Sequence, residues 1–322
     1  MIKSNKIKNL IQKKTISIIG ATGEVGKTLV KLIELSPNFQ IGILCASQKK
    51  IKSNRQYVTH DEIAPNSLVI SALKSDVAKE IEEKLLKKGC RVITNAQALR
   101  YDLRALLSLP DVNGEQILNA KNQLYAVPNC VSTALALALK PLSDLFGIES
   151  VHVTTLQAVS GAGKSEVGEL NIIPYIEGEE EKIEYEPLKL LNVSFPISST
   201  AIRVPVLDGH TQSVSIKFKT LPQREEIISA WNNYKGLPQK NNLFFAAKNP
   251  IVYLEDPFSP QTLLHLNDDK GMRISIGRLR KCLNFHFKFV MLSHNRIQGA
   301  AGAALAICEI LTARKENEEA SS

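Results

Sequence analysis

One cysteine and one histidine stand where their side chains could support nucleophilic catalysis. Cys130 follows Pro128 and Asn129 and comes just before the apolar run ALALALKPL, which predicts a helix. A thiol in the first turn of a helix has its thiolate stabilised by the helix dipole and by free N–H groups. His210 closes a segment that Arg203 opens. A histidine near a thiol can accept its proton at neutral pH, so the pair predicts an acyl-transfer nucleophile.

Arg203 adds a planar fork of donors that fits a carboxylate. Simpler interpretations exist, because a surface salt bridge would account for Arg203, a hydrogen-bonded histidine for His210 and a buried structural thiol for Cys130. The other four thiols lie in apolar strand or helix patterns that burial explains: Cys45, Cys90, Cys282 and Cys308. Five widely spaced cysteines argue against a disulfide framework, so we expect reduced thiols in a cytoplasmic protein.

A glycine-rich turn near the N-terminus has the composition of a dinucleotide site. The run TISIIG, from Thr15, predicts a buried strand, and KTLVKLIEL, from Lys27, predicts an amphipathic helix. Glycines between a strand and a helix let a pyrophosphate approach the backbone, where the helix N-terminus attracts an anion. A tight turn that binds no ligand is the alternative. The predicted cofactor residues here are Gly20, Thr22, Gly23, Glu24, Val25 and Gly26.

The end of the second expected strand, 41–45, favours NADP over NAD. An NAD site usually has an Asp or Glu there, which bonds the ribose hydroxyls. Here the next residues include Ser47 and Lys49 and no acid. A hydroxyl and a cation attract a 2′-phosphate that a carboxylate would repel, although a solvated lysine loop has the same composition.

Alternating strands and helices predict a doubly wound parallel sheet in the first part of the chain. Short apolar runs at 67–72, 91–94 and 124–127 predict further strands, and Asp76 can cap a helix that Gly89 ends. Beyond residue 150 the strands are longer and alternate, which predicts an α+β domain with a largely antiparallel sheet. The expected elements there are strands at 151–158, 213–220 and 284–291, a helix at 224–234, and a small-residue helix from Asn295.

The expected fold is therefore α/β, with a Rossmann-like domain followed by an α+β domain. We expect an NADP-binding domain at 1–130, in which 1–13 is a flexible tail, and a catalytic and dimerisation domain at 131–294. The C-terminal helix, 295–322, would return to the cofactor domain.

Length and composition exclude several classes of protein. The chain has 322 residues, 44% hydrophobic and 22% charged, which suits two compact domains and excludes a disordered, collagen-like or coiled-coil chain. No apolar run approaches the roughly 20 residues that cross a bilayer, and no signal peptide is expected. Five lysines lie in the first 14 residues, and removing them from the net charge of +8 leaves +3. We predict no nucleic-acid partner, no membrane partner and no metal.

Four motifs, taken in order, resemble those of aspartate-β-semialdehyde dehydrogenases. They are Gly-Ala-Thr-Gly-Glu-Val-Gly from Gly20, Pro-Asn-Cys at Cys130, Gln-Ala-Val-Ser-Gly-Ala-Gly from Gln157, and Arg-Val-Pro-Val-x-x-Gly-His from Arg203. The resemblance runs from about 17 to 310. No single motif is specific, but the combination is.

The resemblance implies roles for individual residues. Cys130 would be the nucleophile, His210 the acid/base and Gln157 the residue that positions the acyl intermediate. A solvated acidic helix face is the other interpretation of the run around Glu180. The substrate-binding residues implied are Arg203 for the carboxylate, Glu180 for the amino group, Arg100 and Lys182 for the phosphate, and Asn129. Further cofactor-binding residues implied are Ser160, Gly161 and Asn295.

The implied reaction is the NADPH-dependent reductive dephosphorylation of L-aspartyl 4-phosphate to L-aspartate 4-semialdehyde through a cysteine thioester, in a homodimer or homotetramer. In the family this product feeds lysine, threonine, methionine or diaminopimelate synthesis. One alternative is an N-acetyl-γ-glutamyl-phosphate reductase, whose nucleophile motif is usually His-Pro-Gly-Cys, and another is a non-catalytic binding protein. The sequence departs from the family at Leu73 and Lys74, where Gly-Gly is common, and at His294 and Gln298, where Asp and Lys are usual.

Overall fold

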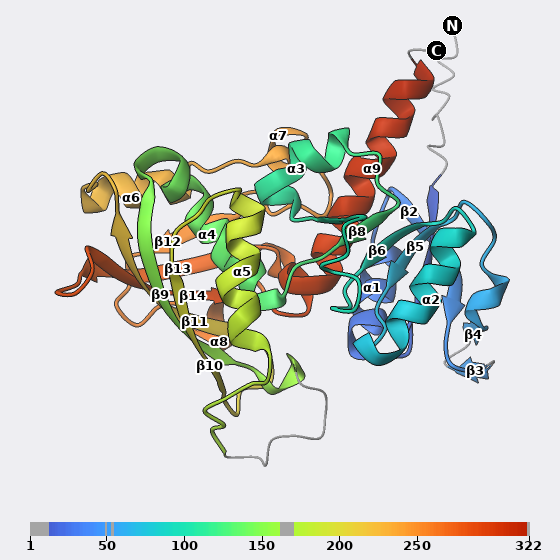
Figure 1. Ribbon diagram of the computed structural model, residues 1–322, viewed down its shortest axis with the longest axis horizontal. Coiled ribbons are helices and arrows are strands. Elements are labelled where there is room, and N and C mark those ends of the chain that lie inside the picture. Colours follow the sequence, from blue (N-terminus) through green and yellow to red (C-terminus); the bar gives the residue numbers. More distant parts are fainter. Residues whose placement is uncertain (1–12, 49, 53–54, 162–170, 321–322) are drawn as a thin grey trace, which may run out of the picture.

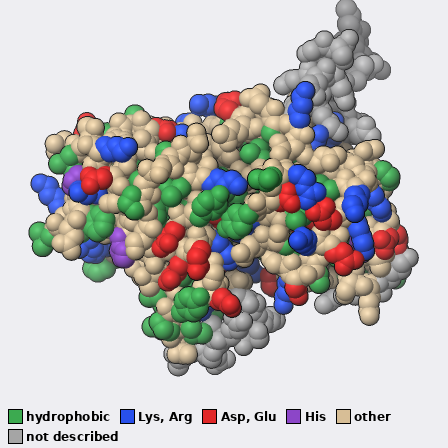
Figure 2. Space-filling model, in the orientation of Figure 1, with side chains coloured by type: hydrophobic (Ala, Val, Ile, Leu, Met, Phe, Trp, Pro, Cys, Tyr) green, Lys and Arg blue, Asp and Glu red, His purple; other side chains and the backbone are tan. Residues whose placement is uncertain are grey.

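The computed structural model describes residues 13–48, 50–52, 55–161 and 171–320 (Figure 1). Two six-stranded sheets with their covering helices lie side by side along the long axis of the molecule (Figure 1). Of the tail expected at 1–13, all but Lys13 lies outside the described residues. Acidic and basic side chains are interspersed over the face that Figure 2 shows.

The first sheet is parallel in every pairing, as the sequence predicts, in the order β2-β1-β5-β6-β8-β7. Its strands are mostly short apolar runs, as suits a sheet covered on both faces. The edge strand β7 is not predicted, since three residues are too few to show a pattern. The strands are β1 (Lys14–Ile19), β2 (Phe39–Cys45), β5 (Leu68–Ser71), β6 (Arg91–Thr94), β7 (Ala105–Leu107) and β8 (Leu124–Ala126).

Three helices connect these strands: α1 (Glu24–Glu34), α2 (Ser75–Lys87) and α3 (Pro110–Asn119). The prediction that Asp76 caps α2 is wrong, because Lys74 occupies the N-cap position and Asp76 Oδ1 accepts the N–H of Val77 (3.1 Å). Gly89, with a φ of +78°, follows the end of α2 as predicted. A small hairpin, β3 (Lys50–Lys52) and β4 (Arg55–Tyr57), and the turn η1 (His60–Glu62) lie between β2 and β5.

The second sheet is antiparallel at its centre and parallel at its edges, in the order β10-β9-β11-β14-β13-β12. The pairs β9–β11, β11–β14 and β13–β14 are antiparallel, whereas β9–β10 and β12–β13 are parallel. This arrangement confirms the predicted α+β domain. The strands are β9 (Ile148–Gln157), β10 (Ile197–Arg203), β11 (His210–Phe218), β12 (Ile251–Leu254), β13 (Ile274–Lys281) and β14 (Phe287–Ser293).

Helices α4 (Cys130–Phe146), α5 (Glu179–Leu191) and α6 (Arg224–Asn232) share a core with the second sheet. The buried Trp231 of α6 packs in this core, and its Nε1 donates to Ala138 O of α4 (3.0 Å). Among the described helices, none has the length and apolar content needed to span a membrane. The short connecting elements are η2 (Val159–Gly161), α7 (Leu237–Lys240), α8 (Thr262–His265) and η3 (Asp268–Gly271).

The chain then returns to the first sheet through η4 (Ile297–Ala301), a π-helical turn, and α9 (Gly302–Ala320). Apolar residues of α9, including Ala304 and Ile307, share one core with Ile16 and Ile18 of β1. The α-helix expected from Asn295 therefore begins seven residues later, at Gly302, after the wider turn η4. The domain bounds themselves remain a prediction.

Glu309 on α9 accepts the N–H groups of Phe244 (3.1 Å) and Phe245 (3.0 Å) and an amide hydrogen of Asn38 (2.8 Å). We predict that Glu309→Ala lowers the free energy of unfolding by about 2–4 kcal/mol, because these donors lose their acceptor. Urea unfolding followed by circular dichroism would measure it. Glu309→Gln, the control, keeps one acceptor and should lose less, and an unchanged midpoint in Glu309→Ala would contradict the prediction.

Candidate active site

Cys130 and His210 are in contact, although 80 positions separate them. Cys130 is the first residue of α4, and His210 is the first residue of β11. Cys130 Sγ lies 3.2 Å from His210 Nε2. The thiol is partly exposed, whereas the imidazole is fully buried. A partly exposed thiol beside an imidazole at a helix N-terminus is suited to nucleophilic catalysis.

The first turn of α4 is confined from two directions. Asn129 caps the helix, since its Oδ1 accepts the N–H groups of Val131 (2.9 Å) and Ser132 (3.3 Å). Gly299 of η4 approaches the same turn so closely that a Cβ at this position would lie 2.6 Å from Cys130 Cβ and 3.0 Å from Cys130 Cα. Only glycine permits this approach.

The second ring nitrogen of His210 determines how the first can act. Nδ1 accepts the N–H of Ala158 (3.0 Å), so a neutral ring carries its hydrogen on Nε2, toward the sulfur. Burial, reinforced by the charge of Arg203, lowers the pKa of His210 to about 3, which keeps the ring neutral. Accepting the thiol proton at Nε2 would place a hydrogen on Nδ1 against the Ala158 N–H. The structure therefore supports the proton-donating part of the expected acid/base role.

Opposing charges act on the thiol. Burial raises the pKa of Cys130 to about 12, and the negative charge of Glu179 acts in the same direction. Arg100 and Arg203 act in the opposite direction, as does the N–H of Val131. The thiol is consequently protonated at neutral pH in the free protein, and its ionisation depends on the charges that surround it.

Arg203, at the end of β10, lies beside the imidazole. Its guanidinium is buried, and Nη1 donates to Ala158 O (2.9 Å). A Cβ on Gly161 would lie 3.2 Å from Arg203 Nη1 and 3.5 Å from His210 Cε1. The absence of a side chain at Gly161 thus lets this turn pack closely against both groups.

Asn295 connects the two segments that carry these groups. Its Nδ2 donates to Ser160 Oγ (2.8 Å), and its Oδ1 accepts the N–H of Gly209, directly before His210 (3.0 Å). The predicted residues Ser160, Gly161 and Asn295 therefore come together, as a group that orients the turn beside the thiol.

Helix α5 presents a carboxylate and an ammonium to the first turn of α4. Asn129 Nδ2 donates to the Glu179 carboxylate, at 3.0 Å from Oε1 and 2.9 Å from Oε2, and Gln157 Nε2 donates to Oε2 (3.3 Å). Lys182, one turn later, bonds the same carboxylate at 2.8 Å, and the two side chains are only 12% exposed. Predicted residues Asn129, Gln157 and Lys182 thus converge on Glu179.

Arg100 has a buried guanidinium that does not use all of its hydrogen-bond donors. Its Nη1 donates to Glu186 of α5 (3.0 Å) and its Nη2 to Asn95 O (3.1 Å). Its Nε is buried and has no hydrogen-bond partner among the described residues. A guanidinium has five N–H groups, so this one keeps donors for a further acceptor, as an anion-binding residue would.

A cavity of about 640 Å³ opens at the carboxyl ends of β1, β2 and β5, where dinucleotides bind in such sheets. Of the predicted cofactor residues, Gly20, Thr22, Gly23 and Ser47 line it. Gly20 has a φ of +76°, and a Cβ there would lie 2.5 Å from Ala72 O. The close-packed glycine turn and the adjoining start of α1 fit the pyrophosphate of a dinucleotide.

The other predicted cofactor residues shape the turn from outside the cavity. A Cβ on Gly26 would lie 2.3 Å from Gly20 O, so this glycine lets α1 pack on the turn. Glu24 forms ion pairs with Lys27 (2.7 Å) and Arg296 (3.3 Å). Val25 packs against the hydrophobic core that the first sheet shares with α9. Lys49 lies outside the described residues.

Comparison with known proteins identifies the family. Models of the semialdehyde dehydrogenase NAD binding domain and dimerisation domain match residues 15–120 and 139–298. The aspartate-semialdehyde dehydrogenases of Archaeoglobus fulgidus and Methanothermobacter thermautotrophicus are 34% and 33% identical to this chain, over 94% and 92% of it and 98% of each relative. The chain belongs to the aspartate-semialdehyde dehydrogenase family. The Candida albicans enzyme, solved with NADP, matches with a TM-score of 0.83 at 31% identity, over 94% of this chain and 99% of that one.

One residue implied by resemblance to the aspartate-semialdehyde dehydrogenases is misplaced. Glu180 does not face the thiol, because its Oε1 accepts the N–H of Ala201 on β10 (2.9 Å). Glu179 occupies the position expected of Glu180. Lys182 lies three residues after Glu179 and so on the same helical face, whereas Glu180 is rotated by about 100° from Glu179. The expectation for Glu180 is therefore wrong by one residue.

The departures from the family pattern lie in two places, at the cavity of the glycine turn and near η4. Leu73 and Lys74 line the cavity of the glycine turn. His294 is buried against Gly271, and burial lowers its pKa to about 4. Gln298, in η4, is buried, and its amide atoms have no partner among the described residues.

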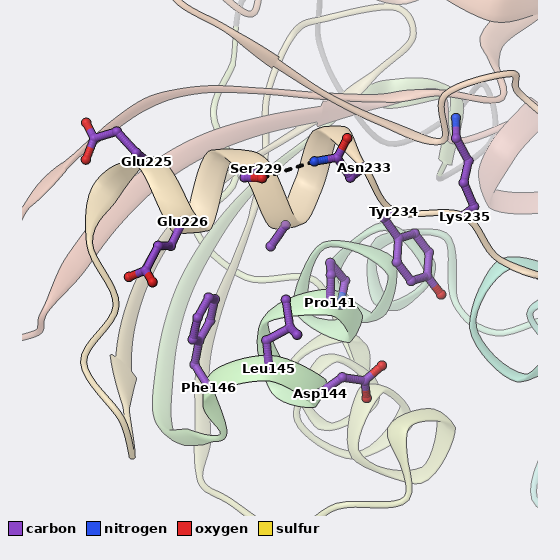
Figure 3. Close-up of a pocket in the computed structure, with 11 residues that line it drawn as sticks. Pro141, Asp144, Leu145, Phe146, Glu225, Glu226, Ser229, Asn233, Tyr234 and Lys235 are labelled. Carbon is purple, nitrogen blue, oxygen red and sulfur yellow. Dashed lines mark hydrogen bonds between the residues drawn. The ribbon is translucent and has the colours of Figure 1, made fainter.

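A separate hollow of about 710 Å³ lies between the far end of α4 and α6 (Figure 3). Pro141, Leu145 and Phe146 line one side, and Ser229 and Asn233, which bond each other at 3.0 Å, line the other. It is about 20 Å along α4 from the thiol, at 1.5 Å per residue. None of its lining residues carries a thiol or an imidazole, so the chemistry belongs to the opposite end of the helix.

Sequence reasoning missed two carboxylates, the partly buried Glu179 and the buried Glu186, because it allowed their run to be a solvated helix face. The signal was available, because positions 179, 182 and 186 repeat at helical spacing alongside the apolar positions Ile183 and Leu190. It also missed the Ala158 N–H, since no side chain marks a backbone donor.

We predict that Gly299→Ala lowers kcat/KM by up to about 100-fold, because the added methyl group must displace Cys130, and a shift of about 1 Å at reacting atoms has an effect of this order. Steady-state kinetics would measure the loss, and thermal unfolding would verify that the variant folds. A folded Gly299→Ala enzyme with wild-type kcat/KM would show that the close approach has no role in activity.

We predict that Glu179→Gln accelerates alkylation of Cys130 by iodoacetamide at pH 7. Glu179 raises the pKa of this thiol, so removing its charge lowers that pKa and increases the thiolate fraction, about tenfold for each unit. Arg203→Met should act oppositely and slow the reaction. Peptide mass spectrometry would follow Cys130 separately from Cys282.

Glu181→Gln is the matched control, since Glu181 lies exposed on the same helix. Equal alkylation rates in Glu179→Gln and Glu181→Gln would exclude an influence of Glu179 on the thiol.

Proposed function

We propose that this chain reduces L-aspartyl 4-phosphate to L-aspartate 4-semialdehyde with NADPH, releasing phosphate, through a thioester on Cys130. The observation that carries the proposal is the contact of Cys130 Sγ with His210 Nε2, at the start of a helix and between the cations Arg100 and Arg203. A non-catalytic relative would have no need to keep this pair of groups in contact.

Three charged groups of the substrate match four charged side chains of the protein. Arg203 would bind the carboxylate through the N–H groups of its guanidinium, beside the imidazole of His210. Glu179 would bind the ammonium group of the substrate. That ammonium would replace Lys182 as the partner of the Glu179 carboxylate. Arg100, through its remaining donors, and the released Lys182 would bind the phosphate. Asn129 and Gln157 hold Glu179 in place and would orient the acyl group.

The covalent step follows from these positions. The Cys130 sulfur would attack the acyl carbon as the thiol loses its proton, the carbon–sulfur bond would form and the carbon–oxygen bond to phosphate would break. Phosphate would leave with the electron pair of that bond and with the proton given up by the thiol, as hydrogen phosphate. The Nε2–H of His210 donates to the sulfur in the resting pair and to the carbonyl oxygen as negative charge develops there. A thioester accepts hydride more readily than a carboxylate does, which is the advantage of a covalent route.

The cofactor would lie along the glycine turn, held by the backbone at Gly20 and Gly23 and by the hydroxyls of Thr22 and Ser47. When bound, NADPH supplies the hydride that reduces the thioester. Ser47 and the absence of an acid at the end of β2 favour NADP over NAD.

A homodimer or homotetramer and a cytoplasmic location complete the proposal. A dimerisation domain model matches this chain, which supports self-association. The five cysteines are free, which suits a reducing compartment.

The reverse reaction tests the proposal directly. With semialdehyde, phosphate and NADP⁺, the wild-type enzyme should form NADPH, followed by absorbance, in a phosphate-dependent manner. Cys130→Ser should reduce the rate at least about 1,000-fold, because a hydroxyl is a far weaker nucleophile. NAD⁺ should be at least about tenfold less efficient than NADP⁺, through loss of charged hydrogen bonds to the 2′-phosphate.

A parallel assay with N-acetylglutamate semialdehyde serves as the control for substrate class. If this aldehyde reacted faster than aspartate semialdehyde, the protein would be an N-acetyl-γ-glutamyl-phosphate reductase in activity and the proposed substrate would be wrong. Substantial activity in Cys130→Ser would refute the thioester.

A further inference from the structure

The carboxylate of Glu186 joins three segments that are far apart in the chain. It is fully buried, in the middle of α5. Its Oε1 accepts from Arg100 Nη1 (3.0 Å) and from the Tyr101 hydroxyl (2.9 Å), and its Oε2 accepts from the backbone N–H of Asn129 (2.5 Å). Each oxygen of one carboxylate therefore serves a different part of the site.

The contacts through Oε1 orient the guanidinium of Arg100. The bond to Glu186 and the bond of Nη2 to Asn95 O hold the group from two sides. With these two bonds made, the buried Nε remains without a partner among the described residues. The direction of the remaining donors is consequently set by Glu186, and with it the place where Arg100 can receive an anion.

The contact through Oε2 acts on the nucleophile. Asn129 is the N-cap of α4, and its N–H lies outside the helix's own hydrogen bonds. The carboxylate of Glu186 accepts the N–H of Asn129, and the side-chain oxygen of Asn129 accepts the N–H groups of Val131 and Ser132. Cys130 is therefore held between two residues whose backbones are fixed.

We propose that Glu186 is a positioning residue that sets the place of the phosphate-binding guanidinium relative to the Cys130 thiol. This inference rests on the proposed function, in which Arg100 binds phosphate. Glu186 itself touches neither substrate nor thiol, and acts through Arg100 and Asn129. Breaking a buried ion pair also destabilises a protein, so the test needs readouts that stability alone does not change.

Glu186→Asp is the test variant, because it keeps the charge and shortens the side chain so that it cannot reach both Arg100 and Asn129. Two steps of the reverse reaction are measured separately. The burst of NADPH from semialdehyde and NADP⁺ without phosphate reports acylation of Cys130, and phosphate-dependent turnover reports release of the acyl group. Glu184→Asp is the matched control, since Glu184 of the same helix bonds Ser199 of β10 instead (2.9 Å).

We expect Glu186→Asp to lower both the burst rate and kcat/KM for phosphate about tenfold, the effect of losing a charged hydrogen bond. Arg100→Lys should lower only kcat/KM for phosphate. In the Arg100→Lys background, Glu186→Asp should lower kcat/KM for phosphate less than about threefold further, since the group it orients is already gone. A folded Glu186→Asp enzyme with both steps within twofold of wild type overturns the proposal, as does an equal loss in the two backgrounds.

If Glu186→Asp does not fold, Tyr101→Phe takes its place, because Tyr101 is half exposed and its hydroxyl donates to the same carboxylate. It should lower kcat/KM for phosphate about two- to fivefold, and an unchanged value overturns the proposal. Failure of the proposed function has a different signature, since the wild-type enzyme would then form no NADPH with phosphate. Alkylation of Cys130 by iodoacetamide, altered in Glu186→Asp and not in Glu184→Asp, would still test the link through Asn129.

Discussion

The close approach of η4 to the first turn of α4 is the constraint on which the site depends. Gly299 lies against Cys130, and the next helix, α9, is fixed in the core of the first sheet by its apolar residues and by Glu309. Arg296, just before η4, bonds both Glu24 of α1 and Asp208 of the segment that leads to His210. The C-terminal segment therefore holds the nucleophile, the imidazole and the glycine turn together, although it contributes none of the reacting groups.

Two ion pairs lie in this site, one buried and one partly buried, and their pairing bears on the proposed function. Arg100 is paired with Glu186, and Lys182 is paired with Glu179. Removing an ion pair from water costs free energy that the attraction between its members often does not recover, so such pairs are poor devices for stability alone. They do keep cations available in a partly closed site until a substrate of matching charge arrives. Arg100 retains unused donors, and in the proposed reaction Lys182 would be released when the substrate ammonium takes its place at Glu179.

The sequence predicts the groups that local motifs carry and misses those that tertiary packing supplies. The glycine turn, Cys130 and the strands of the first sheet follow from short runs whose composition is decisive. Glu179 and Glu180 are adjacent and chemically equal, so only the direction of α5 relative to α4 distinguishes them. The hydrogen on His210 Nε2 depends on a backbone N–H of Ala158, which leaves no trace in the residue types. The roles expected of Arg100 and Gln157 came from the family resemblance, because their spacing in the sequence does not by itself indicate a function.

The charge balance around the thiol also explains how one site can be both inert and reactive. In the free protein, burial and Glu179 raise the pKa of Cys130 and keep the thiol protonated, which protects it from oxidation and alkylation. A substrate ammonium bound at Glu179 would cancel one charge that opposes ionisation, whereas the carboxylate and phosphate bound at Arg203 and Arg100 would offset the charges that favour it. The Nε2 hydrogen of the neutral imidazole points at the sulfur and would stabilise negative charge there as the thiol ionises. The neutral His210 ring, rather than the net charge of the substrate, is therefore the group placed to assist the nucleophile.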